Sequence, residues 1–278
     1  MQKVIDSPGY NAVTQWKYGY VVYNKNDFYI GKAVEKYGEF SESEVRLFRQ
    51  ICQPGDVVVE VGANIGTHTV ALAGIVGERG LVYAFEPQPI VFYTLCANVA
   101  INSLSNVHCL NMAAGATEGF VLIPDIRYDL PGNYGGVEID KFKQGNKIRR
   151  VRLDNSIDVP SLKLLKIDVE GMESEVIRGA KKLITRHKPM LYVENDRVDK
   201  SKELIELIRS FDYRMYWHLP PLFNPDNFAG DNEDLYPGIV SCNMLCIHKS
   251  VTANMDGFKE VTDSNFHPMT GQSPRNQY

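Results

Sequence analysis

The sequence predicts an α/β fold built on a doubly wound, mostly parallel sheet. Short apolar runs such as Val57–Val61 have the length and continuous hydrophobicity of strands that are buried on both faces. Segments of helical length alternate with these runs, and repeated strand–helix units with right-handed crossovers produce an open parallel sheet. The 278 residues suffice for one such domain with additions.

The N-terminal part, residues 1–52, has a different pattern and is interpreted as an extension. Residues 16–30 are rich in aromatic and β-branched side chains, and the polar run 24–27 interrupts them, which predicts a hairpin. Ser41 and Glu44 have the spacing of a capping box at the start of a helix over residues 41–51.

Two strand–helix series then fill the main domain, residues 53–248. The expected strands are 57–61, 81–85, 107–111, 162–168, 190–194, 213–217 and 239–248. The expected helices are 67–74, 89–100, 173–183 and 201–210. Residues 119–152, between the series, contain several glycines and predict an inserted hairpin. The polar residues 249–278 predict a loosely attached C-terminal tail.

Composition and charge argue against several classes of function. The net charge of −4 and the scattered basic residues argue against nucleic acid or an anionic membrane as a partner. We find no apolar run of about 18 residues that predicts a membrane span, and no signal peptide in residues 1–9. Five cysteines without CxxC spacing predict reduced thiols, so we expect a cytoplasmic protein. The oligomeric state stays open, a homodimer included.

Ligands of such sheets bind beyond the carboxyl ends of the strands, so the residues found there are informative. After the first strand, Gly62 and Gly66 permit a tight turn that brings the backbone close to a ligand. The helix that begins near Thr67 directs free N–H groups toward the same place. Glu86 ends the second strand, where its carboxylate can accept both hydroxyl protons of an adenosine ribose.

Two nucleoside cofactors fit this arrangement, NAD and S-adenosylmethionine. NAD requires a GxGxxG turn, and Asn64 occupies the position of its middle glycine. The Glu60 carboxylate would repel a pyrophosphate, whereas it suits a cationic ammonium group. S-adenosylmethionine has an ammonium group and no phosphate, so the sequence favours it over NAD.

A charged string ends a later strand. Lys166, Asp168 and Glu170 alternate, so a strand places them on one face, where they are costly to bury unless paired or used. The alternative is a local Lys–Asp ion pair, with Glu170 capping the next helix. Asp168, Glu170 and Asn195 are conceivable ligands of a divalent metal. However, no histidine or clustered aspartate pair supports such a site, so we expect no metal.

Three strings resemble the FkbM family of S-adenosylmethionine-dependent methyltransferases: VVVEVGANIGTHT (57–69), VYAFEPQP (82–89) and LLKIDVEGMESEVIRGA (164–180). Their order and spacing match as well, and the resemblance covers residues 37–195. It implies a class I, Rossmann-like methyltransferase fold with seven strands, of which 239–248 is the last and antiparallel. It also implies O-methylation of a hydroxyl on a sugar, glycan or natural product.

The resemblance also assigns site residues by position. Around the methionine part of the cofactor it implies Glu60, Gly62, Asn64, Gly66 and Thr67. It implies Glu86 at the ribose, Asn111 to Ala113 at the adenine, and Asp168 at the sulfonium and amino group. The stretch 37–39, beginning with Tyr37, resembles a lid over the cofactor on the substrate side, and 133–135 a loop near the acceptor.

An alcohol acceptor must lose its proton during methyl transfer, and the candidate bases are Asp168, Glu170 and His218. Asp168 has the best position, and Lys166 would keep it ionised. The aromatic, proline-rich segment 218–238 either stacks on a sugar or packs as a surface loop. Alternatives to the small-molecule or glycan acceptor are a nucleic acid, a carboxylate, a non-catalytic binding or scaffold protein, and a nicotinamide-dependent oxidoreductase.

Overall fold

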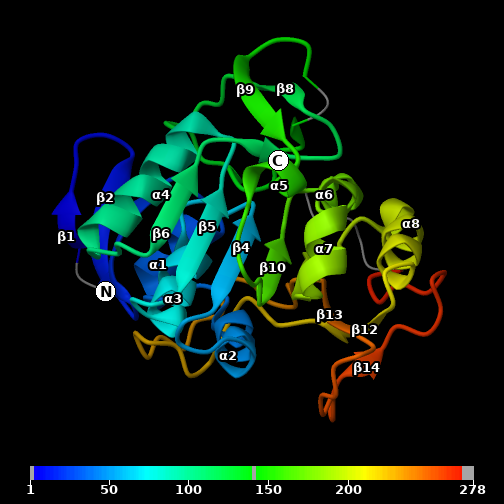
Figure 1. The fold of residues 1–278 in the computed structure, drawn as a ribbon. Coiled ribbons are helices and arrows are strands. Elements are labelled where there is room, and N and C mark those ends of the chain that lie inside the picture. The colour runs from blue at the N-terminus through cyan, green and yellow to red at the C-terminus, as the bar shows by residue number, and fades with distance from the viewer. Residues whose placement is uncertain (1–2, 140–141, 271–278) are drawn as a thin grey trace.

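An eight-stranded sheet forms the centre of the molecule in the computed structural model, which describes residues 3–139 and 142–270 (Figure 1). The strands lie in the order β14-β12-β13-β11-β10-β4-β5-β6. Their bounds are β4 (Val57–Val61), β5 (Leu81–Phe85), β6 (Val107–Leu110), β10 (Leu164–Ile167), β11 (Met190–Glu194), β12 (Tyr213–His218), β13 (Asn243–His248) and β14 (Lys259–Glu260).

The chain winds outward from β4 in both directions. β4 pairs in parallel with β5 on one side and with β10 on the other, and β6 and β11 continue the parallel sheet. β13 is antiparallel to both β11 and β12. The doubly wound α/β prediction is therefore confirmed, together with the antiparallel strand near the C-terminus. The two-residue β14 adds an eighth strand beyond the seven that were expected.

Helices cover both faces of the sheet. On one face, α2 (Glu42–Ile51), α3 (Thr67–Val76) and α4 (Pro89–Ile101) pack against Val58, Val82 and Ala84. On the other face, α5 (Leu153–Ser156), α6 (Glu173–Gly179), α7 (Lys181–His187) and α8 (Val198–Arg209) pack against Val57, Val59 and the other strand residues of that face. Neighbouring residues of one strand thus enter different cores. This explains why all five residues of β4 are buried.

The N-terminal extension forms its own antiparallel sheet of β1 (Lys3–Asp6), β2 (Asn11–Trp16) and β3 (Gly19–Asn24), followed by α1 (Ile30–Tyr37). A hairpin is present, but its turn lies at residues 17–18, and the expected turn at 24–27 is wrong. That polar run instead leads into α1, because the Asp27 carboxylate accepts the backbone N–H of Tyr29 at 2.8 Å. Helix α2 begins after Ser41 as expected. No capping box forms, since the Ser41 hydroxyl donates to the Glu44 carboxylate.

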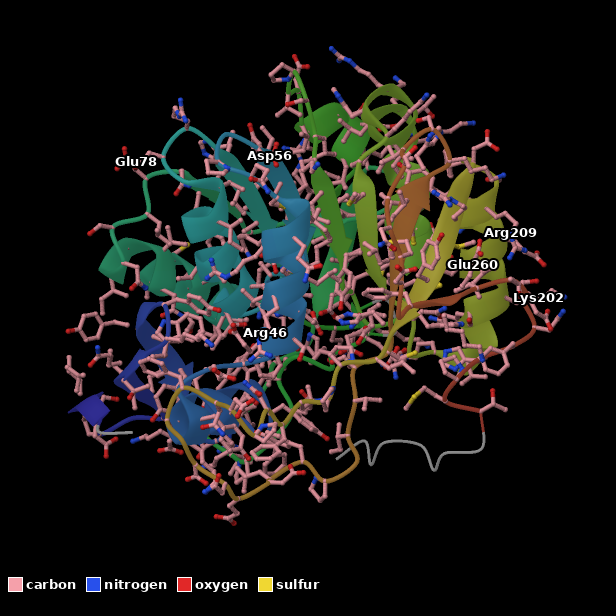
Figure 2. The ribbon with its side chains drawn as sticks, turned by 90° about the horizontal axis from the view of Figure 1, so that it is seen from below. Arg46, Asp56, Glu78, Lys202, Arg209 and Glu260 are labelled. Atoms are coloured by element: carbon pink, nitrogen blue, oxygen red, sulfur yellow. The ribbon has the colours of Figure 1, made fainter. Side chains whose placement is uncertain are left out.

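The inserted hairpin is confirmed as β8 (Gly119–Ile123) and β9 (Asn146–Val151), which pair antiparallel, with β7 (Ala113–Ala114) alongside β9. The prediction of a loosely attached tail is wrong for residues 259–270. β14 pairs with β12, Val261 and His267 are buried, and Arg209 of α8 donates to the Val261 carbonyl, close to Glu260 (Figure 2). Residues 271–278 lie outside the described part.

Within residues 3–139 and 142–270, no helix is both long and apolar enough to cross a membrane.

Candidate functional site

A cavity lies at the carboxyl ends of β4, β5 and β10, and we call it the strand-end cavity. Its lining includes Gly62, Glu86, Ala113, Gly135, Asp168 and Glu170. Five of these six residues were predicted as cofactor-binding or catalytic residues from the sequence. The topology therefore brings together residues that lie more than 100 positions apart.

The glycine turn after β4 is tightly packed against other parts of the protein, and its approach to a ligand stays a prediction. Gly62 has a φ of +83°, and a Cβ atom there would overlap the carbonyl oxygen of Asp168. Gly66 has a φ of +88°, and a Cβ atom there would lie 2.6 Å from the Leu95 side chain. Asn64, at a φ of +51°, occupies the left-handed region between them. Thr67 is buried at the start of α3, and neither it nor Asn64 nor Gly66 is among the described residues that line the cavity, so their contact with the cofactor stays a prediction.

Glu86 is the best-defined acceptor of the cavity. Its carboxylate accepts the backbone N–H of Asn64 at 2.9 Å and that of Gln88 at 2.8 Å. Burial raises the pKa of Glu86 to about 7, although these two hydrogen bonds act in the opposite direction. Each carboxylate oxygen has a further lone pair that can accept a hydroxyl. The group therefore fits a ribose diol.

Lys166 lies beneath the cavity in an ion-pair chain. Its ammonium is 3.4 Å from Glu60 and 3.3 Å from Asp168, and Glu60 also accepts the Thr69 hydroxyl at 2.6 Å. Burial lowers the pKa of Lys166, but the carboxylates around it, Asp168 first, raise it by more. Glu60 is fully buried behind this ammonium, whereas the Asp168 side chain is 39% exposed. Of the two carboxylates paired with Lys166, Asp168 is thus the one that a ligand can reach. Contact of Glu60 with the cofactor stays a prediction.

Glu170 does not cap the next helix, so that part of the alternative is wrong, whereas its other part, the Lys166–Asp168 ion pair, is present. It has a φ of +54°, and its carboxylate lies 2.7 Å from the Arg197 guanidinium. The N–H groups before α6 are accepted by Glu173, at 2.9 Å from Gly171. Burial and then the charge of Asp168 raise the pKa of Glu170 to about 8. Glu170 thus lines the cavity while its carboxylate is paired with Arg197.

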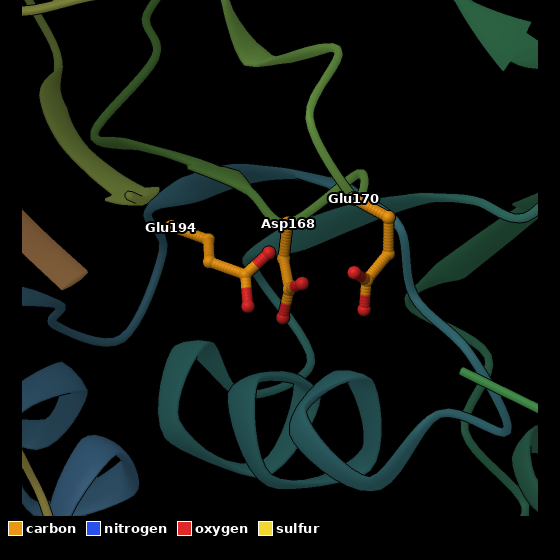
Figure 3. Close-up of side chains that lie close together, drawn as sticks. All are labelled: Asp168, Glu170 and Glu194. Atoms are coloured by element: carbon orange, nitrogen blue, oxygen red, sulfur yellow. The ribbon is translucent and has the colours of Figure 1, made fainter. Parts of the chain in front are cut away.

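Glu194 is a site residue that the sequence reading did not assign. Ligand atoms of Asp168, Glu170 and Glu194 all lie within 4.8 Å of one another, and the three carboxyl groups point the same way (Figure 3). Asn195, the expected third member, instead donates to the Ser201 hydroxyl at 2.9 Å. The sequence does show a polar residue at the end of the strand 190–194. Its proximity to Asp168 follows only from the pairing of β11 with β10.

Asn111 and Ala113 have different roles. Ala113 lines the strand-end cavity as expected. The Asn111 amide donates to the backbone carbonyls of Glu86 and Pro87 at 2.8 and 3.1 Å. Asn111 therefore positions the turn that presents Glu86, and its predicted contact with the adenine stays a prediction.

Tyr37 and His218 are not among the described residues that line the strand-end cavity. Tyr37 is buried, and its hydroxyl donates to the carbonyl of Glu233 and accepts the N–H of Leu235. His218 accepts or donates at 2.8 Å from the Tyr192 hydroxyl, and it lines a separate cavity of about 430 Å³. Burial lowers the pKa of His218 to about 4. The predicted roles of Tyr37 at the cofactor and of His218 as the base therefore stay predictions.

The aromatic segment after β12 packs against α1. Tyr236 and Phe223 contact Tyr37, and the Asn224 amide donates to Glu39 at 2.7 Å. These contacts support the interpretation of the segment as a packed loop.

The insertion covers the strand-end cavity. Gly135, Val137 and Ile139 line it, and the Gln88 amide donates to the Tyr134 carbonyl at 2.9 Å. The cavity measures about 50 Å³, whereas ligand pockets usually measure about 300–1,000 Å³. The acceptor set fits a nucleoside, which needs more room than this cavity offers.

Comparison of the sequence with known proteins identifies its family. The Methyltransferase FkbM domain matches residues 60–215. The hexuronic acid methyltransferase AglP of Haloferax volcanii is 29% identical over 150 residues, which are 49% of this chain and 54% of that protein. The 31-O-demethyl-FK506 methyltransferase FkbM of Streptomyces tacrolimicus is 28% identical over 202 residues, 62% of this chain and 77% of that protein.

A crystal structure of the methyltransferase FkbM from Methylobacillus flagellatus KT is similar to 73% of this chain and 50% of its own, with a TM-score of 0.47 and 19% identity. The chain thus spans about half the length of AglP and of this structure. The family match covers more than half of the sequence and includes the glycine turn, Glu86 and Asp168. The chain belongs to the FkbM family of methyltransferases, and its cofactor is S-adenosylmethionine.

Proposed function

We propose that the chain transfers the methyl group of S-adenosylmethionine to a hydroxyl group of a sugar, glycan or natural product. The observation that carries this proposal is the strand-end cavity, in which Glu86, the Gly62 turn and the exposed Asp168 carboxylate meet. The names of two relatives, a hexuronic acid methyltransferase and a 31-O-demethyl-FK506 methyltransferase, support the choice of acceptor class.

The cofactor would be held by acceptors that the chain already presents. Glu86 would accept the ribose hydroxyls, and Ala113 would border the adenine. Gly62 lets the backbone approach without a Cβ atom, and Asp168 would accept the ammonium group. S-adenosylmethionine supplies a methyl group on a sulfonium, whose carbon–sulfur electron pair stays on sulfur when the methyl passes to oxygen.

The residues of the chain must position the acceptor and remove its proton. We assign the base to Asp168, because it lines the cavity and is 39% exposed. Glu170 is the second candidate, but the Arg197 guanidinium holds its carboxylate at 2.7 Å. Closure of the insertion over the cavity would exclude water and align the reactants, which can lower the barrier by several kcal/mol.

Mass spectrometry of candidate acceptors tests the proposal. Incubation of the full chain with S-adenosylmethionine and a panel of glycans and hydroxylated natural products should add one methylene unit to at least one of them. Asp168→Asn is the control variant, and it should methylate the acceptor much less if the chain itself catalyses the transfer. Methylation of RNA or of carboxylates alone would contradict the acceptor class. Binding of S-adenosylhomocysteine without transfer to any acceptor would favour the non-catalytic alternative.

A further inference from the structure

One oxygen of the buried Glu194 carboxyl group lacks a hydrogen-bond partner in the described part of the chain. Glu194 ends β11, and the residue is 9% exposed. Its Oε2 is shielded from solvent and has no hydrogen-bond partner among the described residues. A buried carboxyl group without a partner is costly, so it requires a proton, a cation or a ligand. Its side chain points to the same side as those of Asp168 and Glu170 (Figure 3).

The spacing of the three carboxyl groups suits one divalent cation. Asp168 and Glu170 follow β10, Glu194 ends β11, and these strands are neighbours, so each side chain comes from a rigid position. Their ligand atoms lie within 4.8 Å of one another. Oxygens on opposite sides of Ca²⁺ are about 4.6–5.2 Å apart, and those around Mg²⁺ about 4 Å. One ion can therefore reach all three with little movement.

The local charges leave room for a cation. Lys166 is shared between Asp168 and Glu60, at 3.3 and 3.4 Å. Arg197 is shared among three carboxylates, Glu170, Glu138 and Asp196, at 2.7, 3.6 and 3.5 Å. The described ion pairs of these two cations do not include Glu194. Negative charge is thus in excess at this edge of the sheet.

We propose that Asp168, Glu170 and Glu194 form a binding site for a divalent cation of the Mg²⁺, Mn²⁺ or Ca²⁺ class. Carboxylate oxygens are the ligands that these hard cations prefer. The sequence predicted no metal, because no histidine or clustered aspartate pair accompanies Asp168, Glu170 and Asn195. In the structure Glu194, and not Asn195, lies beside Asp168 and Glu170. The set therefore has three carboxyl groups, whereas the residues considered from the sequence were two carboxyl groups and an amide.

The position of the cation also indicates the acceptor, and this step rests on the proposed function. Asp168 and Glu170 belong both to the cation site and to the lining of the strand-end cavity. A second cavity of about 260 Å³ is lined by Glu170, one of these acids, and by Arg197. Three carboxylate ligands leave coordination positions for two adjacent oxygens of an acceptor, such as a vicinal diol of a sugar. The cation would lower the pKa of the hydroxyl that it binds.

Titration with Mn²⁺ tests the site without reference to methyl transfer. The full chain, treated with a chelator and dialysed, is titrated with MnCl₂ by calorimetry and by electron paramagnetic resonance. We expect one site with a Kd below about 1 mM. Glu194→Gln keeps the shape and should weaken binding at least about tenfold. Glu78→Gln, on an exposed turn away from the site, is the matched control and should bind like the wild type.

Two results would overturn the site: no Mn²⁺ binding below 1 mM, or wild-type Mn²⁺ binding by folded Glu194→Gln. If Glu194→Gln does not fold, Asp168→Asn serves in its place. Full methylation of a hydroxyl acceptor by metal-free protein would overturn the catalytic use of the cation and leave the proposed function intact. A 1:1 Mn²⁺ site without methylation of any hydroxyl would support the site and contradict the proposed function.

Discussion

Cofactor affinity should depend on pH through Glu86. Burial raises the pKa of Glu86 to about 7 in the cofactor-free protein, and the carboxylates of Asp168 and Glu60 act in the same direction. Ribose hydroxyls donate to the ionised form, so binding favours loss of the proton. About one tenth of Glu86 is ionised at pH 6 and about nine tenths at pH 8. The Kd of S-adenosylhomocysteine should therefore be about tenfold weaker at pH 6 than at pH 8.

The direction of this pH dependence can be checked independently by counting the protons that are released when the ligand binds. Binding at pH 6 should release close to one proton from Glu86, and binding at pH 8 close to none. Calorimetry in two buffers of different ionisation enthalpy measures this number directly. Glu86→Gln cannot ionise, so this part of the pH dependence should disappear. At pH 8 the variant should bind about 10- to 100-fold more weakly, because a charged acceptor is lost.

Glu78→Gln removes an exposed carboxylate elsewhere and is the control for net charge. Other acids near the cavity titrate as well, so the comparison of the wild type with Glu86→Gln isolates the contribution of Glu86. Equal wild-type affinity at pH 6 and pH 8 would refute the reasoning. So would a folded Glu86→Gln variant that retains the full pH dependence.

Three further predictions concern catalysis and the architecture of the site. Asp168→Asn should lower turnover at saturating cofactor by about 10²–10⁴, and Glu170→Gln by less, in a steady-state assay; equal turnover by the wild type and both variants would exclude the pair as the base. Gly62→Ala should lower the free energy of unfolding by about 3 kcal/mol or more in a denaturant titration, because its Cβ atom overlaps backbone and its φ is positive. Gly257→Ala, at a matching φ of +86° in a turn with open space around it, should cost only about 1 kcal/mol; equal costs would contradict the close approach. Lys166→Met leaves buried carboxylates unpaired and should cost about 3–5 kcal/mol by the same titration, whereas a loss below about 1 kcal/mol would contradict the ion-pair chain.

The central sheet and the cofactor turn could be predicted because their signals are local. The run Val57–Val61 indicates a buried strand and the glycines after it indicate a tight turn, and each pattern needs only a few adjacent residues. The N-terminal turn was misplaced because polar residues start helices as well as turns, and only the contact of Asp27 with Tyr29 distinguishes the two. The packing of the C-terminal segment was missed because the buried Val261 is isolated in a polar stretch without periodicity.

Site residues that depend on distant contacts escaped the sequence. Glu194 becomes a partner of Asp168 only when β11 is placed beside β10, and strand order is not encoded locally. Tyr37 was expected at the cofactor, but its hydroxyl contacts Glu233 and Leu235, nearly 200 residues away. Such contacts follow from the whole fold.

The most direct test of the central claim is calorimetric titration of the full chain with S-adenosylhomocysteine at pH 8, with NADH as the comparison ligand. If the strand-end cavity is the cofactor site, S-adenosylhomocysteine should bind at 1:1, NADH should not bind, and Glu86→Ala should weaken the affinity by about 2–3 kcal/mol in a folded protein. Wild-type affinity in folded Glu86→Ala, or binding of NADH in place of S-adenosylhomocysteine, would contradict the account.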